Sequence, residues 1–199
     1  LNSCEKDAII FTNGDNDTFP LWFAQEVEGY RTDMKVINYS LLSSDWHYNQ
    51  MKRKTYEAPP VETILEEPDY RAGTRDYIFV GKNSTPVEAK AFVNYMKQGK
   101  DIDPRTSRFG YASMPFNTIY INVDKEAALK NGLVRADQAN QMVDRIQWTI
   151  SGNGFSKADL AIIDLLAAYK WDRPLYFTSS FIQGANRGLS DYLQQEGIA

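Results

Sequence analysis

The order of apolar runs near the start of the chain predicts a strand–helix–strand unit. Residues 8–12 form an apolar run of strand length, residues 13–18 are rich in turn formers, and residues 19–28 show a helical pattern. Gly29 is a natural helix stop, and residues 35–40 form a second strand-length run. Because the connections are short, the helix is expected to cross over between two parallel strands.

The middle of the chain alternates between predicted elements and irregular stretches. A second helix is expected to run to about Met51, with its cap at Ser43, Ser44 or Asp45. Residues 52–74 are rich in proline and charge and predict a long irregular excursion. Residues 76–80 predict a third strand. A third helix is expected to begin at Thr85-Pro86 and to end at Gly99, with one apolar stripe made of Ala89, Phe92, Val93 and Met96.

The last part of the chain completes the predicted fold. Residues 100–116 read as irregular, and the alternating residues 118–123 predict a half-exposed strand at a sheet edge. Ser156 and Asp159 resemble a capping box that opens a helix over residues 157–169, and residues 175–178 predict a final strand. These elements predict an α/β fold: a Rossmann-like, mainly parallel sheet with flanking helices, room for an antiparallel edge strand, and long loop excursions.

Composition limits the class of protein. The 199 residues are 43% hydrophobic, which suffices for one core, so residues 1–199 are expected to form a single domain. The net charge of -4 gives no basic surface for nucleic acid, which is therefore not an expected partner. No apolar run approaches the roughly 20 residues that a membrane span needs. The chain reads as a soluble segment excised from a larger protein.

The candidate ligand-binding residues follow three predicted strands. In a parallel sheet, the loops at the carboxyl ends of the strands share one edge, where ligands commonly bind. The loops at residues 13–18, 41–46 and 178–181 qualify. They are expected to form one cleft for a hydroxyl-rich ligand or a cation, lined by Asn13, Asp15, Asn16, Asp17, Asp45, Trp46, Thr178 and Ser179.

The same loop allows other interpretations. Asp17 or Thr18 could simply cap the helix while the preceding residues make the turn. A calcium loop is disfavoured, because Thr18 and Ala24 stand where such a loop needs glycine and glutamate. Asp15-Asn16-Asp17-Thr18 also resembles the nucleophile loop of haloacid dehalogenase-type phosphatases, so the alternative function is a self-contained metal-dependent phosphatase or hydrolase that uses Asp15 and Asp17.

Two further features concern aromatic and titratable residues. His47 is the single histidine, and no G-x-S-x-G elbow accompanies it, so a surface or packing role is favoured over a catalytic base. Trp22, Phe23, Trp46 and Tyr48 could present ring faces to a sugar, although core packing is the simpler interpretation. The sequence assigns no catalytic residue, no cofactor and no metal ligand.

Three stretches carry a family resemblance. The longest stretch comprises residues 10–22, residues 24–29 and Arg31-Thr32-Asp33. The second comprises Ser40-Leu41-Leu42 and Asp45-Trp46. The third comprises Leu165-Leu166, Trp171 and residues 173–177. They resemble the family called domain of unknown function 2723, whose members are large inner-membrane proteins of Gram-negative bacteria. Their membrane part is similar to protein O-mannosyltransferases.

The resemblance implies a function for the parent protein and a place for this chain. The parent would be a glycosyltransferase, and this chain its periplasmic domain after the membrane part, which binds or positions an acceptor and is not catalytic alone. Its expected partners are the N-terminal membrane domain of the same polypeptide and a protein or glycan acceptor.

Overall fold

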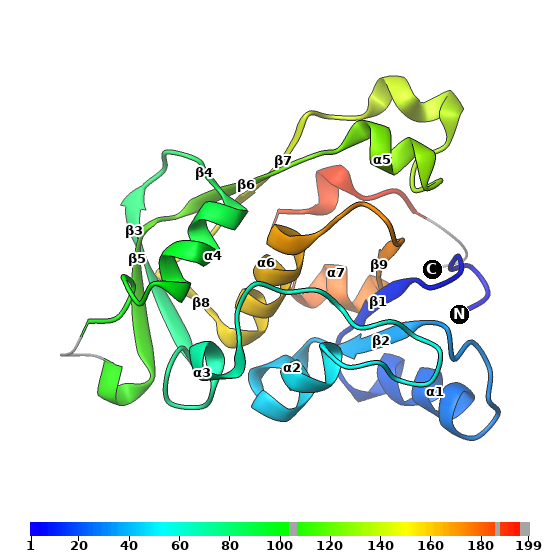
Figure 1. Ribbon diagram of the computed structural model, residues 1–199, viewed down its shortest axis with the longest axis horizontal. Coiled ribbons are helices and arrows are strands. Elements are labelled where there is room, and N and C mark those ends of the chain that lie inside the picture. Colours follow the sequence, from blue (N-terminus) through cyan, green and yellow to red (C-terminus); the bar gives the residue numbers. More distant parts are fainter. Residues whose placement is uncertain (104–106, 186–187, 196–199) are drawn as a thin grey trace.

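The computed structural model describes residues 1–103, 107–185 and 188–195 and divides the strands into three sheets of three strands each (Figure 1). The strand orders are β2-β1-β9, β5-β3-β8 and β4-β6-β7. The strands are β1 (Ile9–Thr12), β2 (Lys35–Asn38), β3 (Tyr77–Asn83), β4 (Val87–Glu88), β5 (Tyr111–Phe116), β6 (Thr118–Asn122), β7 (Arg145–Thr149), β8 (Gly154–Ser156) and β9 (Leu175–Phe177). The α-helices are α1 (Asp15–Glu26), α2 (Asp45–Met51), α3 (Glu67–Tyr70), α4 (Ala89–Lys97), α5 (Lys125–Lys130), α6 (Lys157–Ala168) and α7 (Ser179–Ala185).

The first sheet confirms the predicted crossover. β1 pairs with β2 in parallel, with Ile9 opposite Lys35 and Thr12 opposite Asn38, and α1 connects the two strands. β9 pairs in parallel with the other side of β1. β1 is buried along its whole length because it is the central strand and has neighbours on both sides.

The remaining strands do not extend this sheet, so a Rossmann-like fold is not confirmed and the molecule is a mixed α/β structure. β3 pairs with β5 in parallel and with β8 antiparallel, while β6 pairs with β4 in parallel and with β7 antiparallel. β6 is thus a central strand, and its predicted place at a sheet edge is wrong. Apolar patterning predicts that a segment is a strand, but the partners are chosen by long-range packing.

Residues 111–116 were expected to be irregular but form β5. Ala112 and Met114 are buried while their neighbours in the strand are not, which is the alternation of a strand with one covered face. Pro115 obscures that pattern, yet it is tolerated because β5 is an edge strand. Its carbonyl oxygen lies so close to β3 that a Cβ on Gly81 would approach it to 2.5 Å, so only glycine fits there.

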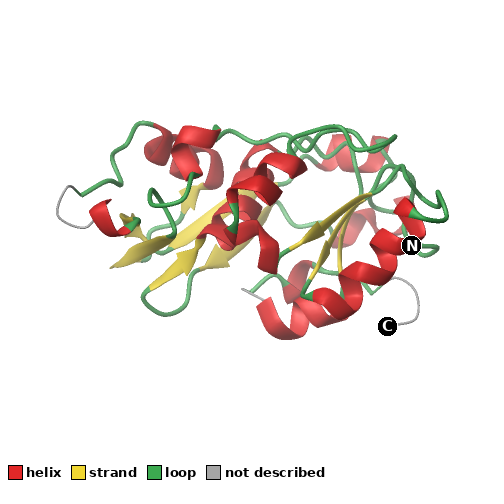
Figure 2. Cartoon of the chain, turned by 90° about the horizontal axis from the view of Figure 1, so that it is seen from below, coloured by secondary structure: helices red, strands yellow, loops and turns green. Residues whose placement is uncertain are grey.

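Helix α6 forms the centre of the core (Figure 2). Ser156 and Asp159 make the predicted capping box at its start, and ten of its twelve residues are buried. The helix packs against α4 and against the short 3-10 helix η1 (Ser40–Ser43), which follows β2. In the views of Figures 1 and 2 it lies between the first sheet and the other strands, so it joins the parts of the fold.

The excursion over residues 52–74 is irregular as expected, apart from α3. It is fixed to the core by polar contacts. Asp164 of α6 accepts hydrogen bonds from the backbone nitrogens of Ile64, at 2.7 Å, and Leu65, and from the hydroxyl of Tyr48, at 2.6 Å. Burial raises the pKa of Asp164, whereas these hydrogen bonds favour its charged form.

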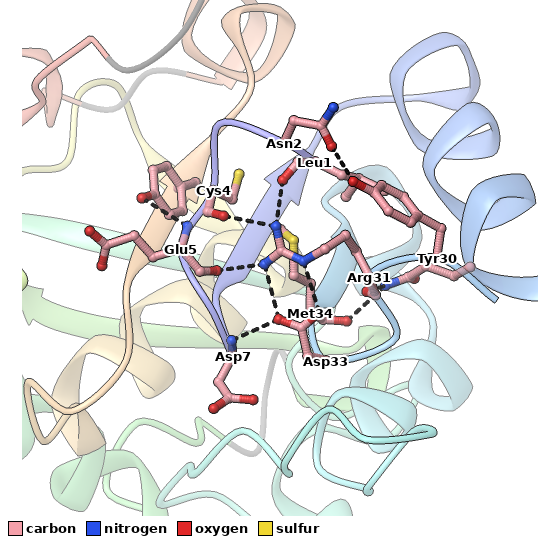
Figure 3. A network of polar contacts seen from close by, with 11 residues as sticks. Leu1, Asn2, Cys4, Glu5, Asp7, Tyr30, Arg31, Asp33 and Met34 are labelled. Carbon is pink, nitrogen blue, oxygen red and sulfur yellow. Dashed lines mark hydrogen bonds and ion pairs between the residues drawn. The ribbon is translucent and has the colours of Figure 1, made fainter. Parts of the chain in front are cut away.

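The N-terminal segment is held by Arg31 (Figure 3). All five N–H groups of its guanidinium have an acceptor: the carbonyl oxygens of Leu1, Cys4 and Glu5, and both carboxylate oxygens of Asp33. Asp33 also accepts a hydrogen bond from the backbone nitrogen of Asp7, just before β1. The first residues of the chain are therefore bound to the turn that precedes β2.

A second buried arginine fixes the segment after α4. The guanidinium of Arg75 forms two hydrogen bonds with the carboxylate of Asp101, at 2.6 and 2.8 Å, and both side chains are almost fully buried. It also donates to the carbonyl oxygen of Met96 at the end of α4. Arg75 thus connects the segment before β3 with the end of α4 and with the chain that leads to β5.

We predict that Asp101→Ala lowers the free energy of unfolding by about 3–5 kcal/mol, because it leaves the buried guanidinium of Arg75 without a counter-charge. Urea denaturation followed by circular dichroism measures this change. Asp137→Ala is the control, since the Arg135–Asp137 pair is exposed and should contribute little. Equal effects of the two substitutions would contradict the prediction.

Candidate functional site

The acidic loop after β1 is largely the first turn of α1. The helix starts at Asp15, four residues earlier than expected, because Gly14 supplies the backbone conformation of the cap with a φ of 84°. Asp15 and Asn16 are exposed on this turn. Asp17 points back and accepts a hydrogen bond from the backbone nitrogen of Asn13, at 2.9 Å. The N-cap is Gly14 and has no side-chain cap hydrogen bond, so Asp17 closes the turn before the helix and does not cap it.

Asp17 also connects the carboxyl ends of β1 and β9. Its Oδ2 accepts hydrogen bonds from the hydroxyl of Thr178, at 2.7 Å, and from the hydroxyl of Ser180. Asn13 contributes a longer contact from its side-chain nitrogen to the carbonyl oxygen of Ser180. Of the predicted residues, the structure brings Asn13, Asp17 and Thr178 together, whereas Ser179 is exposed.

Ser180 was missed, and one signal could have identified it. Thr178 accepts a hydrogen bond from the backbone nitrogen of Phe181, so it caps α7. With Thr178 as the cap, Ser180 lies in the first turn of α7 and its hydroxyl faces Asp17. Burial raises the pKa of Asp17, but hydrogen bonds from Ser180, Thr178 and Asn13 more than offset this effect and lower the pKa below its usual value.

Asp45 belongs to a different group of charges. Its carboxylate accepts a hydrogen bond from the backbone nitrogen of Ala72, at 2.7 Å, and forms an ion pair of 2.9 Å with Lys157 at the start of α6. Lys157 is buried and also pairs with Asp76, at 2.8 Å. Asp45 therefore compensates a buried cation, and none of its hydrogen bonds joins it to the Asp17 group.

Trp46 lies at a pocket between α1, β2 and α2. The indole is 56% exposed and meets the ring of His47 edge-on at 5.0 Å. Trp22 of α1 packs against the other side of His47, with centroids 6.1 Å apart. The pocket has a volume of about 280 Å³ and is lined by Trp22, Gln25, Glu26, Met34, Lys35, Val36, Ile37, Trp46, His47, Gln50, Met51 and Thr55.

The aromatic residues therefore divide between two roles. Tyr48 is fully buried and stacks on Tyr70, as core packing predicts. Three rings on α1 and α2 are exposed, those of Phe19, Phe23 and Trp46. The ring of Phe19 stacks on Trp22. Sequence reasoning identified Trp46 as a site residue, but it did not identify Gln25, Lys35 and Gln50, because they reach the pocket from three separate elements.

His47 is a buried, neutral side chain at the base of this pocket. Only 3% of it is exposed, and its Nε2 accepts a hydrogen bond from the backbone nitrogen of Asn38, at 3.1 Å. Its Nδ1 then donates to the side-chain oxygen of Gln50, also at 3.1 Å. Burial lowers the pKa of His47. His47 is thus a packing residue, and its Nε2 accepts the hydrogen bond of a backbone nitrogen of β2.

The metal-dependent phosphatase interpretation requires a group of side chains that could hold a metal ion. Within the described parts of the chain, no group of three or more His, Cys, Asp or Glu side chains is arranged to hold a metal ion. Asp15 is exposed, and one oxygen of Asp17 is already engaged by three donors. The other oxygen, Oδ1, is buried and has no hydrogen-bond partner among the described atoms.

A family model described as TMEM260-associated domain 2 matches residues 1–199. The chain belongs to this family. The match supports a domain of unknown function but not the domain of unknown function 2723 family specifically. No curated protein and no solved structure matches this family member significantly. Across residues 1–103, 107–185 and 188–195, no helix has both the length and the apolar character that crossing a bilayer requires.

We predict that Asp17→Ala destabilises this family member by about 1–2 kcal/mol, because Asn13, Thr178 and Ser180 lose their shared acceptor. Asp15→Ala is the matched control on the same turn and should cost about 0.5 kcal/mol. Urea denaturation at pH 7 compares the two variants. If Asp15→Ala lowers the free energy of unfolding more than Asp17→Ala does, the role of Asp17 in connecting the ends of β1 and β9 is wrong.

His47 should make the fold sensitive to mild acid. A pKa lowered by burial means that the unfolded chain binds a proton more readily, so the free energy of unfolding should fall as pH drops below about 6.5. The chain has one histidine, so NMR can follow its ring directly. A midpoint below about 6.5 is expected, and His47→Gln should remove this part of the pH dependence. A midpoint at or above that value would contradict it.

Proposed function

We propose that this chain is a non-catalytic, acceptor-binding domain of a larger membrane glycosyltransferase, and that the pocket between α1, β2 and α2 holds a sugar ring of the acceptor. The observation that carries the proposal is the pocket itself. Two tryptophan rings stand beside side-chain amides and a carboxylate in one hollow. Aromatic faces pack on the apolar faces of sugar rings, and amides and carboxylates bind hydroxyl groups.

The dimensions of the pocket agree with this proposal. Its volume of about 280 Å³ is close to the lower end of the roughly 300–1,000 Å³ that small-molecule sites occupy. Trp46 is more than half exposed and is not needed to fill the core, so it is free to contact a ligand. The side-chain amides and the carboxylate come from α1 and α2, which pack against β2 and η1 respectively.

The place of the domain in a larger protein is also part of the proposal. The resemblance to membrane proteins related to protein O-mannosyltransferases implies a membrane domain in the same polypeptide and a periplasmic location for this part. On this model, sugar transfer takes place in the membrane part, and this domain positions a glycan-bearing acceptor. The phosphatase alternative has weaker support, because one oxygen of Asp17 already accepts hydrogen bonds from the backbone of Asn13 and from two hydroxyl groups.

We predict that Trp46→Ala weakens the binding of methyl α-mannoside or short mannose oligosaccharides about tenfold, equivalent to about 1.4 kcal/mol. Chemical-shift changes of the tryptophan side-chain N–H groups in NMR titrations measure the affinity. Phe109→Ala is the control, since this ring is similarly exposed but lies against Tyr111 of another sheet.

Three results would contradict the proposal. The first is that none of these sugars perturbs the pocket tryptophans. The second is that Phe109→Ala weakens binding as much as Trp46→Ala. The third is that residues 1–199 alone transfer sugar from a polyprenyl donor or hydrolyse generic phosphate esters with magnesium, because either activity would make the domain an enzyme.

A further inference from the structure

The pocket contains a buried lysine that lacks a negatively charged neighbour. Lys35 lies on β2 and is only 4% exposed. Its Nζ donates to the carbonyl oxygen of Arg53, at 2.6 Å, and to the hydroxyl of Thr55, at 2.9 Å. Both acceptors are neutral, and an ammonium group has three protons to donate. Lys35 and Thr55 both line the pocket, and the charge of Lys35 is close enough to His47, another lining residue, to help lower its pKa.

The other fully buried cations of the molecule form ion pairs. Arg75 is paired with Asp101, and Lys157 is paired with both Asp45 and Asp76. In the described part of the chain, no ion pair within 4 Å involves Lys35. An unpaired buried charge is costly, so folds normally provide a counter-charge. Lys35 is therefore an exception among the fully buried cations, and it lines a pocket. The half-buried Arg173 also donates only to carbonyl oxygens, but it does not line this pocket.

We propose that the pocket selects a sugar that carries an anionic group, a carboxylate or a phosphate, and that Lys35 binds this group. The inference rests on the proposed function and adds the charge of the ligand. Trp22 and Trp46 contact the ring, while the ammonium group of Lys35 gains the counter-charge that the fold does not supply. A neutral sugar would leave that charge uncompensated.

The charges around Lys35 define the electrostatic environment of the site. Burial lowers the pKa of Lys35 to about 8, and the nearby positive charge of Arg173 adds to this effect. From α2, His47 faces the same pocket as a neutral group, and the side chain of Arg53 is exposed. From α1, Glu26 lines the rim, where its exposed carboxylate accepts a hydrogen bond from Tyr56. Among the described residues that line the pocket, Glu26 is the one acidic group that opposes an anion, and solvent screens it.

This environment predicts how binding depends on pH. Free Lys35 loses its proton near pH 8, and a bound anion would hold that proton more tightly. Affinity for the acidic sugar should therefore be highest below pH 7 to 8 and should fall by up to about tenfold per unit above pH 8. The unmodified chain suffices for this measurement, so the test does not depend on whether a variant folds.

The experiment compares four probes on the wild-type chain by NMR titration: methyl α-mannoside, glucuronate, mannose 1-phosphate and inorganic phosphate. Lys35→Met removes the charge and keeps the length of the side chain. Lys170→Met is the control, because Lys170 is exposed and pairs with Glu62 away from this pocket. Glu26→Gln tests the opposing charge and should tighten binding of the acidic sugars.

The expected result is that glucuronate or mannose 1-phosphate binds at least about tenfold more tightly than methyl α-mannoside, and that Lys35→Met but not Lys170→Met abolishes the difference. The comparison of the two acidic sugars identifies the carboxylate or the phosphate as the preferred group. Equal affinity for neutral and acidic sugars would overturn this inference and leave the proposed function standing. Phosphate binding as tightly as the acidic sugars would overturn it as well, since the ring would then contribute nothing. Failure of every sugar to bind would overturn both.

Discussion

The fold depends on the compensation of three charged side chains on a buried helix. α6 lies in the core along almost its whole length, yet it carries Lys157, Asp159 and Asp164. Each of them needs a partner, because an unpaired charge in the core costs several kcal/mol. The partners are Asp45 and Asp76 for Lys157, Ser156 and Tyr39 for Asp159, and Tyr48 with the backbone of residues 64–65 for Asp164. These contacts connect α6 to α2, to the excursion, to the residue after β2 and to the residue before β3, so they fix the position of the pocket-forming helix α2 relative to the core.

The same rule separates structural from functional charges. Asp45 is a carboxylate at the carboxyl end of a parallel strand, where ligands often bind, but its contacts are those of a counter-charge for Lys157. Asp17 likewise accepts hydrogen bonds from the backbone nitrogen of Asn13 and from two hydroxyl groups. Lys35 differs, since its acceptors are neutral although it is buried. A buried group whose charge is not compensated within the fold is a better candidate for ligand binding than an exposed acidic loop.

Local sequence signals predicted the elements that depend on neighbouring residues. The strand–helix–strand unit at residues 8–40 and the capping box of Ser156 and Asp159 are confirmed, because turn chemistry and apolar periodicity determine them within a short stretch. The packing role of His47 also agrees with its burial. The start of α1 was placed too late, because Gly14 acts as the cap without a side-chain signal, and β5 was missed, because Pro115 interrupts its pattern.

The sequence by itself thus determined that the chain has a mixed α/β structure with a parallel crossover at its start. It also showed which residue types were available to bind a ligand. Only the tertiary structure decided which strands share a sheet and which side chains meet. Lys157 and Asp45 are 112 positions apart, and Ser180 and Asp17 are 163 apart. Such pairs are selected by the packing of α6 and by the parallel pairing of β9 with β1, and apolar periodicity carries no information about either. The pocket has the same origin, because its walls come from α1, β2 and α2 and from the excursion that supplies the acceptors of Lys35.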